Sequence, residues 1–169
     1  MRIIAGDYKG RKLKAPRRRA RPSTDMVREA CFSILGSEIV EADVLDLYAG
    51  SGAFGLEALS RGAASADFVE VSRDSLGALD HNIATLGVGD VSVIHQLKAS
   101  LFIENLAPHA YDVAFADPPY ESDQAGRMVE AFREAAFARI LIVEHSAKQV
   151  FEADRVRNYG NTTLSFLFG

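Results

Sequence analysis

Short apolar segments and amphipathic segments alternate along most of the chain. Apolar runs predict strands, and apolar residues at three- and four-residue spacing predict the helices between them. The predicted strands are 44–48, 67–71, 91–94, 113–116 and 140–143, and the predicted helices are 54–61, 76–86, 101–106 and 124–135. This regular alternation predicts an α/β fold with a mostly parallel, doubly wound sheet and helices on both faces.

The end of the chain departs from this alternation. Residues 150–156 and 162–168 flank Asn158-Tyr159-Gly160-Asn161, and no helical pattern lies between them. Turn residues between two strand-like segments are typical of a β-hairpin. We therefore expect seven strands, with an antiparallel C-terminal hairpin at the edge of an otherwise parallel sheet.

The first 36 residues precede the alternating region and are basic. Their first fifteen residues predict a small hairpin, and residues 16–22 have the composition of a charged linker. Ser23-Thr24-Asp25 supply capping side chains for a helix that ends at Gly36. Cys31 lies on the apolar stripe of that helix, which indicates packing rather than nucleophilic chemistry.

Length and composition match one ordinary globular domain. The 169 residues are 48% hydrophobic and 25% charged, unlike a disordered chain. No apolar run approaches the ~20 residues of a membrane-spanning helix, and the first residues do not form a signal peptide. One cysteine excludes an internal disulfide and a multi-cysteine zinc site, and the four histidines lack metal-ligand spacing. We expect a cytoplasmic monomer without a metal site.

Charge is distributed unevenly along the chain. The first thirty residues carry a net charge of +7, whereas the remainder carries −11. A basic segment on an acidic body favours binding to a polyanion, although a solvated basic surface would have the same composition. The charge therefore suggests nucleic-acid binding without identifying the nucleic acid.

A glycine-rich loop follows the first strand of the alternating region. The segment Asp46-Leu47-Tyr48-Ala49-Gly50-Ser51-Gly52-Ala53-Phe54-Gly55 places Gly-x-Gly-x-x-Gly between a strand and a helix. Glycines there allow a tight turn and let backbone N–H groups approach a ligand at a helix N-terminus. Glu70 ends the second strand, where a carboxylate can accept hydrogen bonds from ribose hydroxyls. These features predict a nucleoside cofactor.

Asp46 narrows the choice of cofactor. A carboxylate directly ahead of the loop would repel the pyrophosphate of a dinucleotide but attract a cationic ligand such as S-adenosylmethionine. Asp46 can also accept hydrogen bonds from the loop backbone, and the two roles are compatible. Ser51 is expected to be a donor within the loop rather than a nucleophile, because no base is placed beside it.

The most specific signal is Asp117-Pro118-Pro119-Tyr120, which directly follows the fourth predicted strand. The prolines restrict the backbone and remove two N–H donors, which leaves carbonyl oxygens available as acceptors. Asp117 and the Pro118 carbonyl can accept hydrogen bonds from the exocyclic amine of a base, on which Tyr120 can stack. Since ligands bind at the carboxyl ends of parallel strands, this loop and Gly50 should face one crevice.

These motifs resemble those of class I S-adenosylmethionine-dependent methyltransferases that act on amino groups of adenine, cytosine, guanine or glutamine. Further segments resemble the bacterial 16S rRNA guanine-N2 methyltransferase family over nearly the whole chain. The segments are Arg2-Ile3-Ile4-Ala5-Gly6, Gly10-Arg11-Lys12-Leu13, Arg21-Pro22-Ser23-Thr24, Val27-Arg28-Glu29, Gly55-Leu56-Glu57-Ala58-Leu59-Ser60-Arg61-Gly62-Ala63, Asn82 and Tyr159-Gly160-Asn161-Thr162.

The resemblance implies a Rossmann-like methyltransferase sheet, S-adenosyl-L-methionine as cofactor, and methyl transfer to guanine N2. We expect one domain over 1–169, with a basic extension in 1–36 and the cofactor-binding and catalytic core in 43–169. The expected cofactor-binding residues are Asp46, Ala49, Gly50, Ser51, Gly52, Glu70 and Ala99, and the expected catalytic residues are Asp117, Pro118 and Tyr120. The expected RNA contacts are Arg11, Lys12, Arg17, Arg18, Arg19, Arg21 and Arg28. The expected partner is 16S rRNA or an assembly particle of the small ribosomal subunit.

Two positions depart from the family pattern. Ala5 stands where a second glycine is expected, and Gln96-Leu97-Lys98-Ala99 lacks the acidic residue that many methyltransferases use to contact adenine. The same motifs would suit an enzyme that acts on DNA adenine or on a protein glutamine, although the latter would not need a basic extension. A non-catalytic RNA-binding assembly factor is a further alternative, against which the intact motifs argue.

Overall fold

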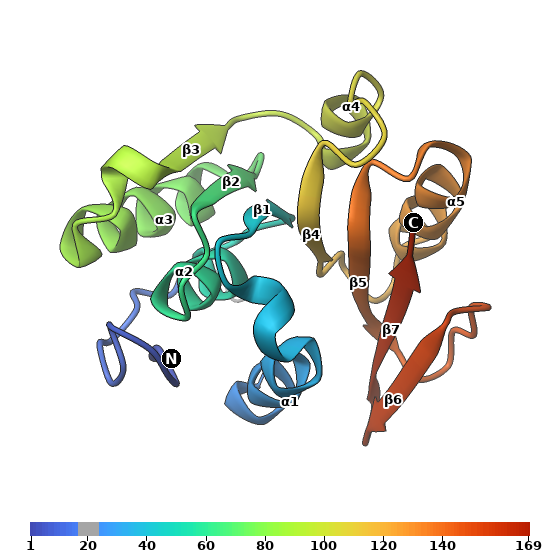
Figure 1. Ribbon diagram of the computed structural model, residues 1–169, viewed down its shortest axis with the longest axis horizontal. Helices are drawn as coiled ribbons and strands as arrows, with labels where there is room; N and C mark the ends of the chain where they lie inside the picture. The colour runs from blue at the N-terminus through green and yellow to red at the C-terminus, as the bar shows by residue number, and fades with distance from the viewer. Residues whose placement is uncertain (17–23) are drawn as a thin grey trace.

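The computed structural model describes residues 1–16 and 24–169 and contains a seven-stranded sheet between two layers of helices (Figure 1). The strand order is β3-β2-β1-β4-β5-β7-β6. Strands β1 to β5 run parallel, whereas β7 is antiparallel to both β5 and β6. The predicted fold class is confirmed, including the antiparallel C-terminal hairpin.

The elements of the alternating region match the predicted ones, with ends that differ by a few residues. The strands are β1 Asp43–Leu47, β2 Ser65–Val69, β3 Ser92–His95, β4 Tyr111–Ala116, β5 Ala138–Ser146, β6 Arg155–Tyr159 and β7 Thr162–Phe168. The helices are α1 Asp25–Leu35, α2 Ala53–Ser60, α3 Arg73–Leu86, α4 Ala99–Ile103 and α5 Gln124–Ala135, with short 3-10 helices η1 Gly36–Ile39 and η2 Gly89–Val91. Within the described ranges, no helix is long and apolar enough to cross a membrane.

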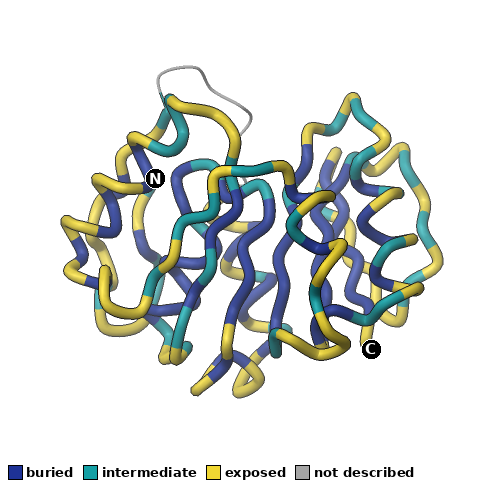
Figure 2. The backbone as a smooth tube through the Cα atoms, turned by 90° about the horizontal axis from the view of Figure 1, so that it is seen from above, coloured by how far each residue is buried: buried dark blue, intermediate teal, exposed yellow. Residues whose placement is uncertain are grey.

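Successive side chains of the central strands point into two different apolar clusters, one on each face of the sheet. Val44 and Phe115 face the cluster that includes side chains of α1, α2 and α3, whereas their neighbours Leu45 and Ala114 face the cluster with α4 and α5. Strands covered on both faces need apolar side chains at successive positions, which explains the continuous apolar runs in the sequence. Figure 2 shows these buried strands passing through the middle of the molecule, with exposed segments outside.

The N-terminal hairpin is confirmed and is fixed to helix α2. Arg2 and Lys12 form an antiparallel bridge. The buried carboxylate of Glu57 accepts hydrogen bonds from the backbone N–H groups of Ile4 (2.8 Å) and Ala5 (3.0 Å). Because a buried carboxylate needs several donors, Glu57 ties the basic extension to the core.

Helix α1 begins and ends as the sequence indicates. The hydroxyl of Thr24 accepts a hydrogen bond from the N–H of Val27 (3.2 Å), and Gly36 ends the helix with a φ of +54°. Cys31 is fully buried, as predicted for a packing residue, and burial raises the pKa of its thiol. Ser23 and most of the predicted linker lie outside the described residues.

The first strand of the C-terminal hairpin lies later in the chain than predicted. The prediction of a strand over 150–156 is wrong, since β6 starts at Arg155 and continues to Tyr159, leaving a short turn at Gly160-Asn161. Val150 is 89% exposed, and the ring of Phe151 packs against His145 at a centroid distance of 4.7 Å. The aromatic residue that contributed to the strand pattern therefore serves side-chain packing outside the sheet.

Candidate active site

The loop between β1 and α2 turns at its glycines. Gly50 and Gly52 have φ angles of +57° and +82°, and a Cβ on Gly52 would lie 2.5 Å from Leu79 Cδ1. At Gly55, a Cβ would lie 2.3 Å from the Phe68 ring. The first two glycines therefore permit the turn, and the third lets α2 approach β2 closely.

Asp46 lies buried beneath this loop. Its carboxylate accepts a hydrogen bond from the N–H of Gly55 (2.8 Å), so the backbone-binding role considered from the sequence is present. Burial raises the pKa of Asp46 to about 8, an effect that the Gly55 bond opposes and the charge of Glu70 reinforces. A cation bound above the loop would favour the ionised form of this carboxyl.

Tyr48, two residues after Asp46, has a φ of +60°. This left-handed backbone conformation is uncommon for an aromatic residue, and such conformations concentrate at functional sites. The sequence gives no signal for it, because only the surrounding structure can hold a residue in that conformation.

Glu70 follows β2 directly and lies against the glycine loop. One carboxylate oxygen accepts from the N–H of Gly50 (2.8 Å), and the other accepts from Val71 (2.7 Å) and Ser72 (2.8 Å). The side chain is only half-buried. Since a carboxylate offers about four lone-pair positions, Glu70 can accept from a ribose hydroxyl while it still holds the loop.

Ala49 and Ser51, two other predicted cofactor residues, form hydrogen bonds through their backbone groups. The N–H of Ala49 donates to the β2 backbone (3.1 Å), and the carbonyl of the buried Ser51 accepts from Asn82 (3.0 Å). Asn82 also exchanges two hydrogen bonds with the Lys14 backbone, so it joins the N-terminal extension to the loop. Ala99 is buried at the start of α4, at the same carboxyl edge of the sheet.

The segment Asp117–Tyr120 leaves the sheet beside the glycine loop. Leu47, the last residue of β1, is the register partner of Ala116, the last residue of β4. Both loops therefore start side by side at the carboxyl edge, where the strand order reverses (Figure 1). Asp117 and Tyr120 are half-buried, and Pro118 is buried.

The hydroxyl of Tyr120 is tied to the C-terminal strands. It lies 2.8 Å from Glu144 Oε1 on β5 and 2.8 Å from Thr162 Oγ1 on β7. Burial raises the pKa of Tyr120, and the charge of Glu144 adds to the effect. The only sequence signal for Thr162 is its place in the segment Tyr159-Gly160-Asn161-Thr162, which resembles the family. No rule of residue spacing connects it to Tyr120.

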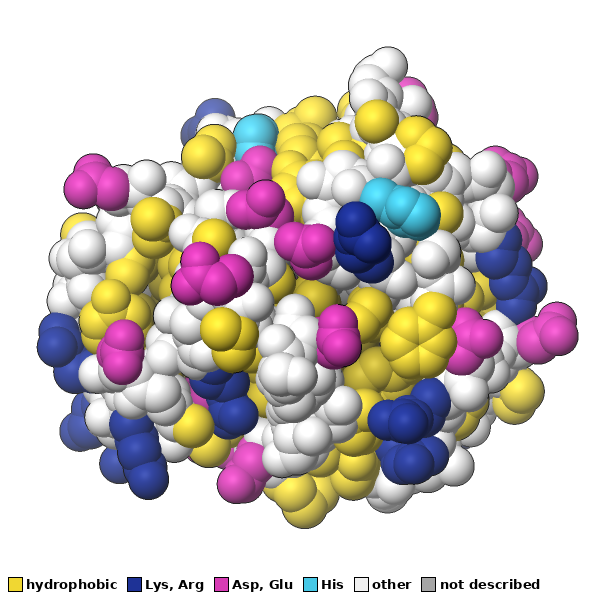
Figure 3. All heavy atoms as spheres, viewed as in Figure 1, with side chains coloured by type: hydrophobic (Ala, Val, Ile, Leu, Met, Phe, Trp, Pro, Cys, Tyr) yellow, Lys and Arg dark blue, Asp and Glu magenta, His cyan; other side chains and the backbone are white. Residues whose placement is uncertain are grey.

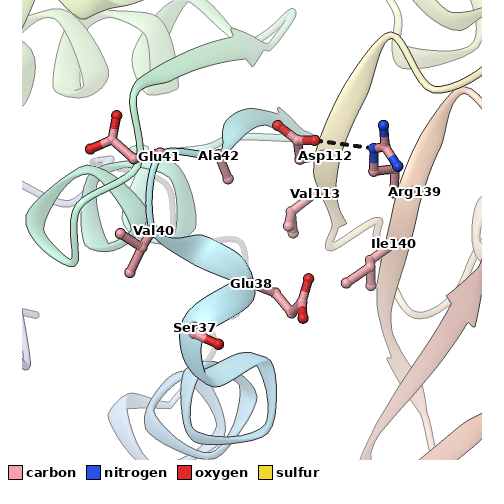
Figure 4. A pocket seen from close by; sticks show the side chains of 9 residues that line it. All are labelled: Ser37, Glu38, Val40, Glu41, Ala42, Asp112, Val113, Arg139 and Ile140. Carbon is pink, nitrogen blue, oxygen red and sulfur yellow. Dashed lines mark ion pairs between the residues drawn. The ribbon is translucent and has the colours of Figure 1, made fainter.

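Among the hollows in the described part of the chain, two border the sheet. One, of about 440 Å³, is lined by Tyr120, Glu121, Ser146, Ala147, Lys148 and Asn161, at the ends of β4 and β5. The other, of about 260 Å³, lies at the opposite end of the strands, where η1 faces the starts of β4 and β5 (Figure 4). It contains the ion pair of Asp112 with Arg139 (3.3 Å) and none of the predicted site residues.

Arg28 must be removed from the predicted RNA contacts. Its side chain is fully buried, lies 3.7 Å from Glu57, and donates to Asp25 (3.0 Å) and the Arg2 carbonyl (2.6 Å). Arg28 lies one turn before Cys31 on the buried face of α1, so the helical spacing could have shown this.

Arg11 and Lys12 are exposed, in agreement with a surface role. In Figure 3 basic side chains gather at the lower left, on the side of the N-terminal segment. Arg17, Arg18, Arg19 and Arg21 lie outside the described residues.

Histidine and acidic side chains do not gather into a metal site anywhere in residues 1–16 and 24–169. His145 is buried, and its ring nitrogens bond the Ser165 hydroxyl (2.9 Å) and the Ser146 carbonyl (3.0 Å). Burial lowers the pKa of His145. These contacts assign the side chain to the packing between β5 and β7.

A family model described as conserved hypothetical protein 95 matches residues 1–167. The chain belongs to this family. Ribosomal RNA small subunit methyltransferase D of Escherichia coli K12 is 45% identical over 121 residues, which cover 71% of this chain and 60% of that protein. The chain thus aligns with less than two thirds of that relative's length, and the resemblance stated from the sequence motifs is confirmed at the level of the family.

Solved structures share the fold of this family member. A hypothetical protein of Thermus thermophilus is similar with a TM-score of 0.85 and 27% identity, covering 100% of this chain and 99% of that one. An RNA methyltransferase of Salinibacter ruber, in complex with S-adenosyl-L-homocysteine, has a TM-score of 0.68 and 15% identity over 88% of this chain and 93% of that one. At such identity the second likeness shows the methyltransferase fold alone.

Proposed function

We propose that this protein transfers the methyl group of S-adenosyl-L-methionine to the exocyclic N2 of a guanine in 16S rRNA, the family resemblance pointing to guanine 966. The observation that carries the proposal is the pairing of Leu47 with Ala116, which places the glycine loop beside the Asp117–Tyr120 loop. A nucleoside cofactor and an amine would therefore meet at one point of the carboxyl edge. The name of the Escherichia coli relative supports small-subunit rRNA as the substrate.

The residues around the glycine loop fit S-adenosyl-L-methionine, which supplies a methyl group on a sulfonium when bound. Glu70 is half-exposed and can accept from the ribose hydroxyls. The positive φ angles of Gly50 and Gly52 leave the loop backbone close to the ligand position. Asp46, beneath the loop, would stabilise the positive charge of the cofactor.

On the substrate side, Asp117 and the Pro118 carbonyl would accept hydrogen bonds from the guanine amine. The lone pair of such an amine is delocalised into the ring, so both acceptors would favour a nitrogen whose lone pair points at the methyl group. The nitrogen would bond the methyl carbon as the carbon–sulfur bond breaks, the electron pair of that bond would stay on sulfur, and the nitrogen would release one proton to solvent. Catalysis would rest on position and on hydrogen bonding, with Tyr120 stacked on the base.

The basic extension would contact the phosphates of the RNA. Arg11 and Lys12 are exposed on the hairpin that Glu57 fixes to the core. The four arginines at 17, 18, 19 and 21 remain in the proposed set on the basis of their charge alone.

One experiment separates this function from its alternatives. The protein is incubated with labelled S-adenosylmethionine and with rRNA, small subunits or DNA, and the modified nucleoside is identified by mass spectrometry. We expect N2-methylguanine from rRNA or the subunit. N6-methyladenine from DNA would show that the substrate is adenine in DNA and not guanine in rRNA. Cofactor binding without any methylated product would favour the non-catalytic assembly factor.

A further inference from the structure

The hydroxyl of Tyr120 is hydrogen-bonded inside the protein, and the residue also borders a hollow. Its hydroxyl lies 2.8 Å from both Glu144 and Thr162, and these two side chains are each only 4% exposed. Elsewhere the residue borders the open hollow of about 440 Å³. A side chain that is held at its polar end and borders a hollow can present a fixed surface to a ligand.

The hydrogen bonds around the hydroxyl form a directed chain. A carboxylate only accepts, so Tyr120 donates its proton to Glu144, and the phenolic oxygen can accept the proton of Thr162. A tyrosine hydroxyl is protonated at neutral pH even at its ordinary pKa of about 10, and burial raises the pKa of Tyr120 further, so the donor persists. Bonds to a charged acceptor are also stronger than bonds between neutral groups.

The two anchoring side chains come from strands β5 and β7, which pair continuously along the sheet. Ser146 on β5 is the register partner of Thr162 on β7, and Glu144 lies two residues before Ser146. Residues two apart on a strand share one face, so Glu144 and Thr162 are diagonal neighbours on the same side of this pair. Both anchors therefore have positions that the sheet determines rather than a loop.

We propose that Glu144 and Thr162 are positioning residues that hold Tyr120 as one wall of a pocket for a purine base, and that the 440 Å³ hollow is this pocket. The inference rests on the proposed function and specifies how its substrate site is built. A hollow of this volume lies within the range of small-ligand pockets. Asp117 precedes Tyr120 by three residues in the same loop, so the orientation of the ring would set the distance between the base amine and the Asp117 carboxylate.

The test uses substitutions that change the hydrogen bonds of the Tyr120 hydroxyl and leave the shape of the side chains nearly unchanged. Tyr120→Phe removes the hydroxyl, Thr162→Val removes one bond, and Glu144→Gln keeps an oxygen that can accept. Steady-state methylation of the RNA on which the wild-type protein acts gives kcat and KM, and calorimetric titration gives the cofactor Kd. We expect kcat/KM for RNA to fall about tenfold in Tyr120→Phe and Thr162→Val, with the cofactor Kd unchanged.

Two comparisons separate positioning from general stability. Glu144→Gln should retain more activity than Glu144→Leu, because only the amide can replace the acceptor. Tyr111→Phe is the matched control, since the Tyr111 hydroxyl also bonds a carboxylate, Asp67 (2.8 Å), but at the other end of β4. That control should keep wild-type kinetics even where its melting temperature falls.

The outcomes also distinguish this inference from the proposed function. Wild-type kinetics in both Tyr120→Phe and Thr162→Val, on whichever nucleoside the unmodified protein methylates, would overturn the positioning role. Equal loss in Tyr111→Phe would do the same, because it would reveal a general effect on folding. Methylation of adenine by the wild type would contradict the guanine assignment alone, and the same variants would then be measured on adenine, whereas methylation of cytosine would also overturn the purine pocket.

Discussion

The glycine loop after β1 and the loop after β4 leave adjacent strands, but contacts of different range hold them in place. Asp46 and Glu70 accept hydrogen bonds from N–H groups of the glycine loop, nine and twenty residues away in the sequence. In the loop after β4, the hydroxyl of Tyr120 is bound by Glu144 and Thr162, which lie 24 and 42 residues further along the chain. Both carboxylates that hold the first loop belong to one β-α-β unit, and Asn82 of the next helix adds a bond to Ser51, whereas the second loop depends on the C-terminal hairpin.

This difference indicates that the two halves of the site can be disturbed separately. Substitutions in the glycine-loop half should change cofactor affinity and leave the β4 loop in place. Substitutions in the other half should change turnover and leave the cofactor in place. Two of the four experiments below test this separation, and the other two test the burial of Asp46 and the surface of the N-terminal hairpin.

The largest effect is expected from Asp117→Ala. Loss of an acceptor that acts on the reacting amine should lower kcat by about 100-fold or more, because such preorganised groups stabilise the transition state. Cofactor affinity should stay unchanged. Rate, cofactor Kd and circular dichroism are measured on one sample, and near-normal turnover in the folded variant would contradict the assignment.

A smaller effect, confined to the cofactor, is expected from Glu70→Ala. Loss of hydrogen bonds to a charged acceptor should weaken S-adenosylmethionine binding by ~1.5–3 kcal/mol in a calorimetric titration. Glu70→Gln is the control, since its amide oxygen can still accept from Gly50. If Glu70→Ala binds the cofactor normally, the side chain serves only the loop and the end of β2.

The pH dependence of stability tests the burial of Asp46. Its pKa is raised from 3.8 to about 8, so between these values the folded state holds a proton that the unfolded state has lost. The free energy of unfolding of the ligand-free protein should therefore fall as pH rises through this window, by up to about 1.4 kcal/mol per pH unit. Asp46→Asn should remove this contribution, as urea denaturation at several pH values would show. Identical slopes in both proteins would mean that Asp46 is already ionised.

The smallest effect is expected from the surface of the N-terminal hairpin. Replacing Arg11 and Lys12 with Ala should weaken RNA binding at low salt and reduce its logarithmic salt slope by ~0.7 for each phosphate contact removed. Cofactor affinity should not change. Arg139→Ala, an exposed cation at the opposite end of the strands, is the control. A slope equal to that of the wild type would exclude both side chains from the phosphate contacts.

Sequence patterns predicted where the two loops of the candidate site lie. The glycine spacing, the position of Glu70 and the prolines after β4 all lie on loops whose place follows from strand–helix alternation. The prediction failed at Arg28, because its helical spacing places this basic side chain on the buried face of α1, beside the buried Glu57. The prediction also failed at the start of β6. Phe151 contributed to the apolar pattern that predicts a strand, but its ring packs against His145 outside the sheet.

By itself, the sequence determined the order of elements, the parallel sheet and the two motif-bearing loops, because hydrophobic periodicity and turn residues act over a few positions. Tertiary structure decided which distant side chains complete the site. Glu144 and Thr162 reach Tyr120 only because β7 folds back antiparallel to β5, and Asn82 reaches both Ser51 and Lys14 only because the fold brings α3 beside both segments. Such contacts depend on the closure of long chain segments, for which local residue patterns carry no signal.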